Sequence, residues 1–195
     1  DAAMALLDKA LAADRKSVRA TMLMGDALRA RGDIEGALET WRRVEHQSVP
    51  HTALVAQRLM DGYIAAGRPQ EGINLLRAYL AEAPSIDLLE VVFKAVLESD
   101  GIDAANVLVS DELRRTPTLL GLDKFLEARI MSAPQNVRPE LAVVKTLVHG
   151  YTQKLARYQC NHCGFKARQF YWQCPGCSQW ETYPPRRTEE LNVMN

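Results

Sequence analysis

Four cysteines form the group of residues in this chain whose type and spacing most clearly predict chemistry. Cys160 and Cys163 are separated by two residues, as are Cys174 and Cys177, and ten residues lie between the two pairs. A tetrahedral metal ion takes four soft ligands at about 2.3 Å, and each Cys-x2-Cys turn supplies two of them. The spacing therefore predicts one structural metal ion held by all four thiolates.

The turn residues beside these cysteines favour the same interpretation. Gly164 follows the first pair and tolerates a positive φ, while Pro175-Gly176 provides a preset turn inside the second pair. Zinc is the default ion, and iron is the alternative because the same thiolate cage is the rubredoxin arrangement. Free buried cysteines or a redox pair are the other interpretations. Four thiolates leave no open coordination position, so a structural and not a catalytic metal is expected.

The remaining residues with chemical potential form no catalytic pattern. His162 lies inside the first cysteine pair, and we expect it to be exposed between ligands. His46, His51 and His149 have no neighbouring Asp, Ser or Cys in a partner pattern, so surface or packing roles are expected. The chain contains no nucleophile elbow, phosphate-binding loop, dinucleotide fingerprint or zinc-protease motif. We therefore expect no enzyme and no small-molecule substrate.

Composition sets the broad class of the protein. The 195 residues are 47% hydrophobic, enough for a sizeable core, and 24 basic residues balance 24 acidic ones. No whole-protein charge therefore drives the chain toward nucleic acid or a membrane surface. There is no apolar run of 18 residues and no signal-peptide pattern. Clustered cysteines favour a reducing cytoplasm, and the opening, which reads as mid-helix, suggests a fragment whose N-terminus lies elsewhere.

Helical repeats are the elements expected to carry this site. Two sets of segments align at steps of 34 and 35 residues: 3–17, 37–50 and 72–85, and then 23–33 and 58–68. This period is typical of tetratricopeptide repeats, in which each unit is a helix, a turn and a second helix. Gly32 and Gly67 are expected to end the first helices. The side chains expected to fill the groove between paired helices are Leu28, Trp41, Tyr63 and Leu76.

The rest of the chain completes the predicted architecture, a mostly α tetratricopeptide-type solenoid with a small C-terminal rubredoxin-like β domain. A third helix pair is expected at 86–116 and a fourth at 118–156, with Pro139 opening the last helix. The expected domains are the solenoid at 1–157, the metal ribbon at 158–184 and a tail at 185–195. The tail has no partner pattern, and we expect it to fray.

Aromatic and basic residues concentrate in the ribbon. Eight of 13 aromatic residues lie between 151 and 183, mixed with turn residues as in two short hairpins. The basic residues of this region are Lys154, Arg157, Lys166, Arg168, Arg186 and Arg187. Such a mixture can bind nucleic acid by charge and stacking, which is the alternative function. We favour a small aromatic core that docks on the repeats through Tyr151, Phe170, Tyr171, Trp172 or Trp180.

With these features, the chain resembles the lipopolysaccharide assembly protein B (LapB, or YciM) family of Gram-negative bacteria. The resemblance rests on the repeats, on LRRTPT at 113–118, and on RYQCNHCGF and YWQCPGCSQWET in the ribbon. It implies that Cys160, Cys163, Cys174 and Cys177 bind the metal. The ribbon alone also resembles the zinc finger of the RadA recombination factors, but no ATPase core accompanies it.

The resemblance further implies a function and a location. Members of this family act as non-enzymatic adaptors that promote degradation, by the membrane protease FtsH, of the deacetylase that commits precursor to lipid A. They sit on the cytoplasmic face of the inner membrane, held by an N-terminal helix without a counterpart here; the present chain is expected to be soluble. The concave face, lined by the first helices, is the expected partner surface. Its candidate residues are Met22, Asp26, Arg29, Gln57 and Asp61.

Overall fold

The computed structural model describes residues 2–155 and 157–192, although the side chains of the last two of these are not described. Asp1, Ala156 and residues 193–195 lie outside the described residues. The expectations for the mid-helix start at Asp1, the extension of the last helix to Ala156 and the end of the tail fall there. The chain divides into two compact units, Asp1–Ala95 and Val96–Asn195, which are described separately.

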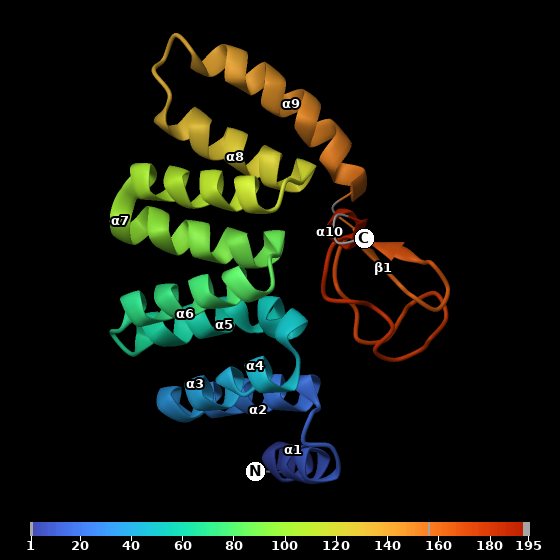
Figure 1. Cartoon of the computed structure of the whole chain (residues 1–195). Helices are drawn as coiled ribbons and strands as arrows, with labels where there is room; N and C mark the ends of the chain where they lie inside the picture. Colours follow the sequence, from blue (N-terminus) through green and yellow to red (C-terminus); the bar gives the residue numbers. More distant parts are fainter. Residues whose placement is uncertain (1, 156, 193–195) are drawn as a thin grey trace. The chain divides into compact units, whose positions relative to one another are not determined.

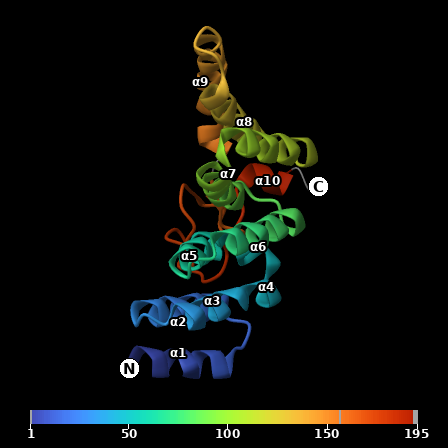
Figure 2. The same ribbon diagram turned by 90° about the vertical axis from the view of Figure 1, so that its left-hand side faces the viewer.

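The first unit consists of stacked helices. They are α1 (Ala2–Ala13), α2 (Val18–Ala30), α3 (Ile34–Arg42), α4 (Val44–Gln47), the 3-10 turn η1 (Val49–His51), α5 (Thr52–Ala65), α6 (Pro69–Glu82) and the start of α7 (Ile86–Arg115). Helix α2 pairs with α3, and α5 pairs with α6, one layer on the next (Figures 1 and 2). The predicted helix-pair repeats are confirmed.

Close packing inside these pairs depends on small residues facing large ones. Trp41 is fully buried, and its indole Nε1 donates to the carbonyl of Met22 at 3.2 Å. A Cβ atom at Gly25 would overlap this indole, so only glycine lets α2 approach α3 so closely. In the next repeat, a Cβ at Gly72 would lie 2.9 Å from the Cβ of Tyr63. The glycines of the predicted grooves are therefore steric requirements of the fold.

Glycines with positive φ mark the turns within the pairs. Gly32 (φ 84°) and Gly67 (φ 72°) end α2 and α5 as predicted. Gly101 (φ 83°) interrupts α7, and the chain reverses direction there (Figure 1). Gly101 follows Gly67 by 34 residues, so the third predicted pair is confirmed with its own turn glycine, which the sequence alignment overlooked.

The second unit continues from α7 into two further helices and the ribbon. Helix α8 (Leu119–Ser132) is capped by the Thr118 side chain, and α9 (Arg138–Leu155) has Pro139 in its first turn, as predicted. Strands β1 (Tyr158–Gln159) and β2 (Lys166–Ala167) and the short helix α10 (Thr188–Asn192) follow. In the part of the chain that the structure describes, no helix has both the length and the apolar character needed to cross a membrane.

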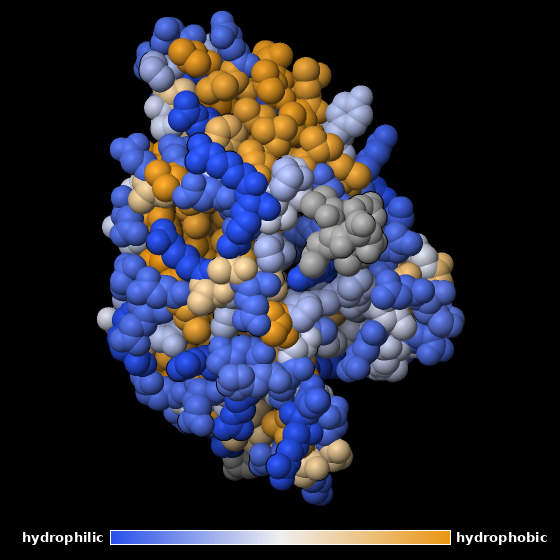
Figure 3. All heavy atoms as spheres, viewed as in Figure 1, coloured by the Kyte–Doolittle hydropathy of each residue, from blue (hydrophilic) through white to orange (hydrophobic). Residues whose placement is uncertain are grey.

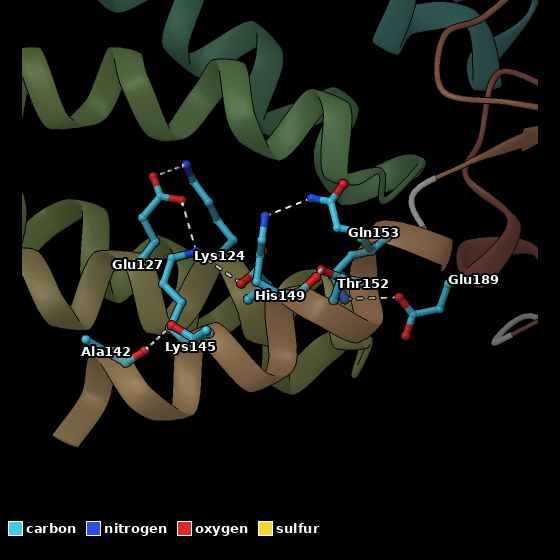
Figure 4. Close-up of polar contacts among 11 residues, drawn as sticks. Lys124, Glu127, Ala142, Lys145, His149, Thr152, Gln153 and Glu189 are labelled. Carbon is cyan, nitrogen blue, oxygen red and sulfur yellow. Dashed lines mark hydrogen bonds and ion pairs between the residues drawn. The ribbon is translucent and has the colours of Figure 1, made fainter. Parts of the chain in front are cut away.

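Polar side chains fill much of the seam between α8 and α9 (Figure 4). Asp123 accepts from Lys145 Nζ at 3.0 Å and lies 2.8 Å from Nδ1 of His149. Buried Lys124 is paired with Glu127 at 2.9 Å. The sequence around His149 indicated no acidic partner, because the partner, Asp123, comes from the neighbouring helix; the contact suits the expected helix-packing role.

The other two helix histidines also have partners that the sequence pattern did not indicate. His51 Nδ1 lies 2.7 Å from the hydroxyl oxygen of Ser48, and His46 Nε2 lies 3.3 Å from a carboxylate oxygen of Glu45. Both contacts are local, because Ser48 and His51 are three residues apart and Glu45 and His46 are adjacent. The expected packing and surface roles of these side chains fit their positions.

The C-terminal segment contradicts one expectation. Residues predicted to fray after the ribbon instead form α10, whose Glu190 side chain is 7% exposed. Strands β1 and β2 pair antiparallel, with Tyr158 opposite Ala167, and an isolated bridge joins Gln173 to Trp180. The two predicted hairpins are confirmed. The chain is mostly helical, with a small two-stranded region that holds the cysteine cluster.

Candidate metal centre

Two tight backbone turns present the four cysteines. In the first, Gly164 N donates to Cys160 O at 2.9 Å; in the second, Ser178 N donates to Cys174 O at 2.8 Å. Gly164 (φ 76°) and Ser178 (φ 59°) both adopt the left-handed conformation. Pro175-Gly176 was expected to provide a preset turn inside the second pair. The structure places the left-handed residue directly after the second cysteine in both turns.

The four sulfur atoms converge on one point between these turns. All of them lie within 4.8 Å of one another; Cys160 Sγ is 3.9 Å from Cys177 Sγ, and Cys163 Sγ is 3.6 Å from Cys174 Sγ. Four sulfurs at about 2.3 Å from a tetrahedral ion would be about 3.8 Å apart. A disulfide requires about 2.05 Å. The arrangement therefore fits a four-coordinate thiolate site and not a pair of disulfides.

The cluster has a shielded side and an open side. Cys160 and Cys174 are each 1% exposed, whereas Cys163 is exposed and Cys177 is partly so. The hydroxyl oxygen of Thr182 lies 3.1 Å from Cys160 Sγ, and a backbone N–H donates to Cys174 Sγ at 3.3 Å. Donors around the shielded sulfurs stabilise thiolates, while the exposed sulfurs leave an entry path for an ion.

The protonation of the thiols is uneven. Burial raises the pKa of Cys160, but hydrogen bonds from Thr182 and from backbone N–H groups outweigh it and lower that pKa to about 6. Cys174 is affected by the same opposing causes, and its pKa is also lowered. A backbone N–H lowers the pKa of Cys177, but burial and hydrogen bonds with the other three cysteines raise it to about 12. Two thiolates thus oppose ionisation of the other two, and a divalent cation relieves that repulsion.

An aromatic core lies beneath the cluster. Tyr158 and Tyr183 are almost fully buried beside the two shielded cysteines. Phe170 packs edge-on against Tyr158 at 5.9 Å between ring centroids and against Trp172 at 5.0 Å. Tyr183 donates its hydroxyl to the carbonyl of Phe165 at 3.2 Å. The expected aromatic core of the ribbon is present.

The ribbon contacts the last helix through residues other than the aromatic side chains that were expected. Tyr151 is 74% exposed and Trp180 is 52% exposed, so neither aromatic side chain is buried in a seam as expected. Instead, Thr188 joins the end of α9 to the ribbon: its N–H donates to Arg157 O at 2.7 Å and its hydroxyl donates to Leu155 O at 2.8 Å. Polar contacts from the supposed tail therefore fix the ribbon to the last helix.

Two more side chains of the C-terminal segment complete this attachment. Both oxygens of the Glu189 carboxylate accept from the first N–H groups of α8, Leu119 N at 2.5 Å and Leu120 N at 3.0 Å. Arg187 lies over the ring of Tyr158, 4.2 Å from its centroid, and donates to Arg168 O at 2.9 Å. Sequence reasoning missed Glu189 because 70 residues separate it from the helix end it caps.

The remaining predicted site residues take defined places. His162 is exposed, and the metal-binding group found among the described residues consists of the four cysteines without it. One of the basic side chains counted toward a nucleic-acid surface has other contacts in the ribbon, since Arg187 donates to the backbone carbonyl of Arg168 and lies over the ring of Tyr158. Most ribbon aromatics are packed, and Phe165 and Trp180 remain partly exposed at 44% and 52%. Fewer aromatic side chains are therefore free to stack on bases than the sequence count suggested.

Stacked helix pairs followed by a four-cysteine ribbon define a helical-repeat protein that carries a rubredoxin-type domain. The family model of the LapB zinc ribbon, described as a rubredoxin metal binding domain, matches residues 158–185. Lipopolysaccharide assembly protein B of Escherichia coli K12 is 31% identical over 189 residues, 96% of this chain. The protein of that name from Haemophilus influenzae is 27% identical over 195 residues. The chain is thus a homologue of the LapB family and carries its rubredoxin-type domain, and it spans about half the length of these relatives, 48% of each.

Proposed function

We propose that this chain is the repeat-and-ribbon part of a non-enzymatic adaptor in lipopolysaccharide assembly. The observation that carries the proposal is the similarity to lipopolysaccharide assembly protein B over 96% of the chain, ribbon included. The described residues support it in a second way. Their one conspicuous chemical group is a saturated four-thiolate cluster, which suits a structural role and leaves no open position for a substrate.

The ribbon's part in this function is to hold one zinc or iron ion through Cys160, Cys163, Cys174 and Cys177. The sulfur spacing and the donors on Cys160 and Cys174 suit a divalent cation. When bound, the ion supplies folding free energy, since so small a unit cannot bury enough apolar surface. In this proposal the ribbon of residues 158–184 follows a solenoid of residues 1–157, and Thr188 and Glu189 attach the two.

The proposed mechanism is to bring two proteins together. One is FtsH, a membrane protease, and the other is the deacetylase that commits precursor to lipid A. An adaptor of this kind acts at the cytoplasmic face of the inner membrane, and the anchor would belong to a part of the protein outside this chain. It needs two binding surfaces and no reacting group, which agrees with the absence of a catalytic motif from the sequence.

The first helices of the repeats offer one such surface. Ion pairs link α2 and α5: Arg58 Nε donates to Asp26 at 2.7 Å, and Arg29 lies 3.4 Å from Asp61. Exposed apolar side chains accompany them, Leu23 at 45% and Ile64 at 52%. Protein interfaces commonly surround apolar side chains with a polar, solvent-accessible rim. Met22, expected on this face, is 7% exposed and belongs to the core, so that prediction is wrong.

A chimera tests the proposal. The segment of the Escherichia coli relative that this chain matches is replaced by the chain, and the deacetylase half-life is measured in cells that lack their own LapB. The half-life is expected to be short with the chimera and long with its Cys160→Ser variant. Ile64→Glu on the proposed face is expected to lengthen it, whereas Val107→Glu, at a similarly exposed valine of α7, leaves it short. A folded, metal-loaded chimera that leaves the deacetylase stable would refute the proposed mechanism.

A further inference from the structure

Helix α9 has an apolar face that no described part of the chain covers. Val143 and Leu147 are each 63% exposed, Val144 is 47% exposed and Tyr151 is 74% exposed. At 100° per residue, these four side chains fall within about a third of the helix circumference and form one stripe. We call this set the α9 stripe. Apolar atoms gather over α9 in the space-filling view as well (Figure 3).

The opposite face of α9 is already used. Lys145 and His149 point toward α8 and contact Asp123, and Thr152 is 2% exposed (Figure 4). The helix therefore meets its neighbour through a partly polar seam and turns its most apolar side outward. The last helix of a solenoid ordinarily presents a polar outer face, because it has no further repeat to cover it. An exposed stripe at this position indicates a surface that is covered in the working protein.

The charged residues and the glycine beside the α9 stripe indicate which kind of partner covers it. Glu140 and Lys154 lie on the same side of the helix as Leu147, seven residues before it and seven residues after it. Each charge is therefore about 10 Å from Leu147 along the helix axis, with opposite signs at the two ends. Gly150 has open space where its side chain would be. The face is thus self-complementary under a two-fold rotation centred on Leu147.

We propose that the α9 stripe is the interface for a second copy of this chain, paired antiparallel through α9. In that register Leu147 meets Leu147 of the second copy on the two-fold axis, and Val143 meets Tyr151. Glu140 faces Lys154 of the second copy at both ends, and the bulk of Val144 lies opposite the gap at Gly150. A two-fold interface uses one patch twice, which is the commonest way for identical chains to associate.

The first test measures oligomeric state. Sedimentation and light scattering of the metal-loaded chain over a concentration series are expected to show a concentration-dependent dimer. Val143→Glu is expected to raise the dimer dissociation constant by at least about tenfold, since both copies place an uncompensated charge in the apolar stripe. Leu147→Glu, which puts two carboxylates at the axis, is expected to raise it further. Val107→Glu is the matched control: this valine is 60% exposed on α7, and its replacement leaves the dimer intact.

The second test determines register. Glu140→Lys alone places like charges at both ends of the pair, as does Lys154→Glu alone, and each is expected to weaken the dimer in low salt. Combining them restores opposite charges in the antiparallel register, so the double variant is expected to dimerise like the original chain. In a parallel pair, where like residues face each other, no such rescue follows.

Each other outcome would refute the interface. A chain that stays monomeric at about 100 μM has no dimer of useful strength through this face, and a different protein would then have to cover the stripe. A dimer insensitive to Leu147→Glu uses another surface. A dimer weakened by both single charge reversals but not rescued by the double variant would rule out the antiparallel register. Circular dichroism and metal content, expected unchanged in every variant, separate these results from misfolding.

Discussion

The repeat helices and the ribbon stabilise themselves by different means. The helices of the first unit bury large apolar side chains completely, among them Trp41, Leu59 and Leu76. In the ribbon the strands are two residues long, and its buried cluster consists of two tyrosines and two cysteines with partly buried neighbours. Burial is sufficient in a stack of helices, but a unit of some 28 residues has too small a core, and we expect a metal at its four clustered cysteines to compensate. Local helix preference and packing therefore govern one region, and ligand chemistry governs the other.

Loss of the metal should give the largest loss of structure, and that loss should be confined to the ribbon and the helix end it contacts. With Cys160→Ser or chelation, the ribbon is expected to unfold, because metal binding and folding are coupled in such sites. Hydrogen exchange should rise across residues 158–190 and in the first turn of α8, which Glu189 caps. Amides of α2, α3, α5 and α6 should keep their protection. Loss of protection throughout those helices would show that the ribbon supports the repeats as well.

Removing a central core side chain of the repeats should destabilise the helices while the ribbon keeps its metal. Trp41→Ala leaves a cavity against Gly25 and removes the hydrogen bond to Met22 O, and is expected to cost about 3–5 kcal/mol of unfolding free energy. Denaturant unfolding followed by helical circular dichroism measures this loss, while the metal content should not change. Trp180→Ala, at a half-exposed tryptophan of the ribbon, is the control and should cost much less. Equal losses in the two variants would contradict the comparison.

The attachment between ribbon and helices can be weakened separately. Glu189→Gln keeps the shape of the side chain but removes the charge that accepts from the N-terminus of α8, so we expect a loss of about 1 kcal/mol. Exchange should increase at Leu119 and Leu120, with the metal retained. Glu98→Gln, at an exposed position of α7, provides the control. Metal loss in Glu189→Gln would mean that this contact supports the ribbon itself and not only its attachment.

The smallest predicted effect is a pH dependence in the first unit. Burial lowers the pKa of His51 below its ordinary value, so the folded state favours the neutral ring. The free energy of unfolding that depends on a neutral His51 is fully present above about pH 6.5. It is lost as the pH falls toward and through the folded-state pKa, because the unfolded state then binds more protons than the folded state. His51→Gln should flatten the decline in stability between about pH 7.5 and pH 5.5. The ribbon affects the original chain and the His51→Gln variant equally, so the difference between their unfolding free energies reports on His51 alone. Identical dependence of the two unfolding free energies on pH would disprove this role.

Much of the fold could be predicted from the sequence because its signals are local or periodic. Gly32 and Gly67 end helices because glycine alone adopts positive φ without strain, and their 35-residue spacing indicates a repeated unit. The two Cys-x2-Cys pairs predicted the cysteine cluster, since two intervening residues allow one turn to direct both sulfurs of a pair to the same point. Gly101 carried the same signal and could have been found by continuing the repeat period.

Other features were decided only by the tertiary structure. Glu189 caps a helix 70 residues earlier, and Asp123 meets His149 across two helices; no local pattern specifies which distant groups meet. Helical periodicity indicates that Val143 and Leu147 share a face with Tyr151, but not whether that face points toward α8 or toward solvent. The packing of α8 determines the direction of this face, because α8 contacts the opposite side of α9, which carries Lys145 and His149. The sequence thus determined the elements and the cysteine cluster, and the tertiary structure determined which surfaces remain exposed.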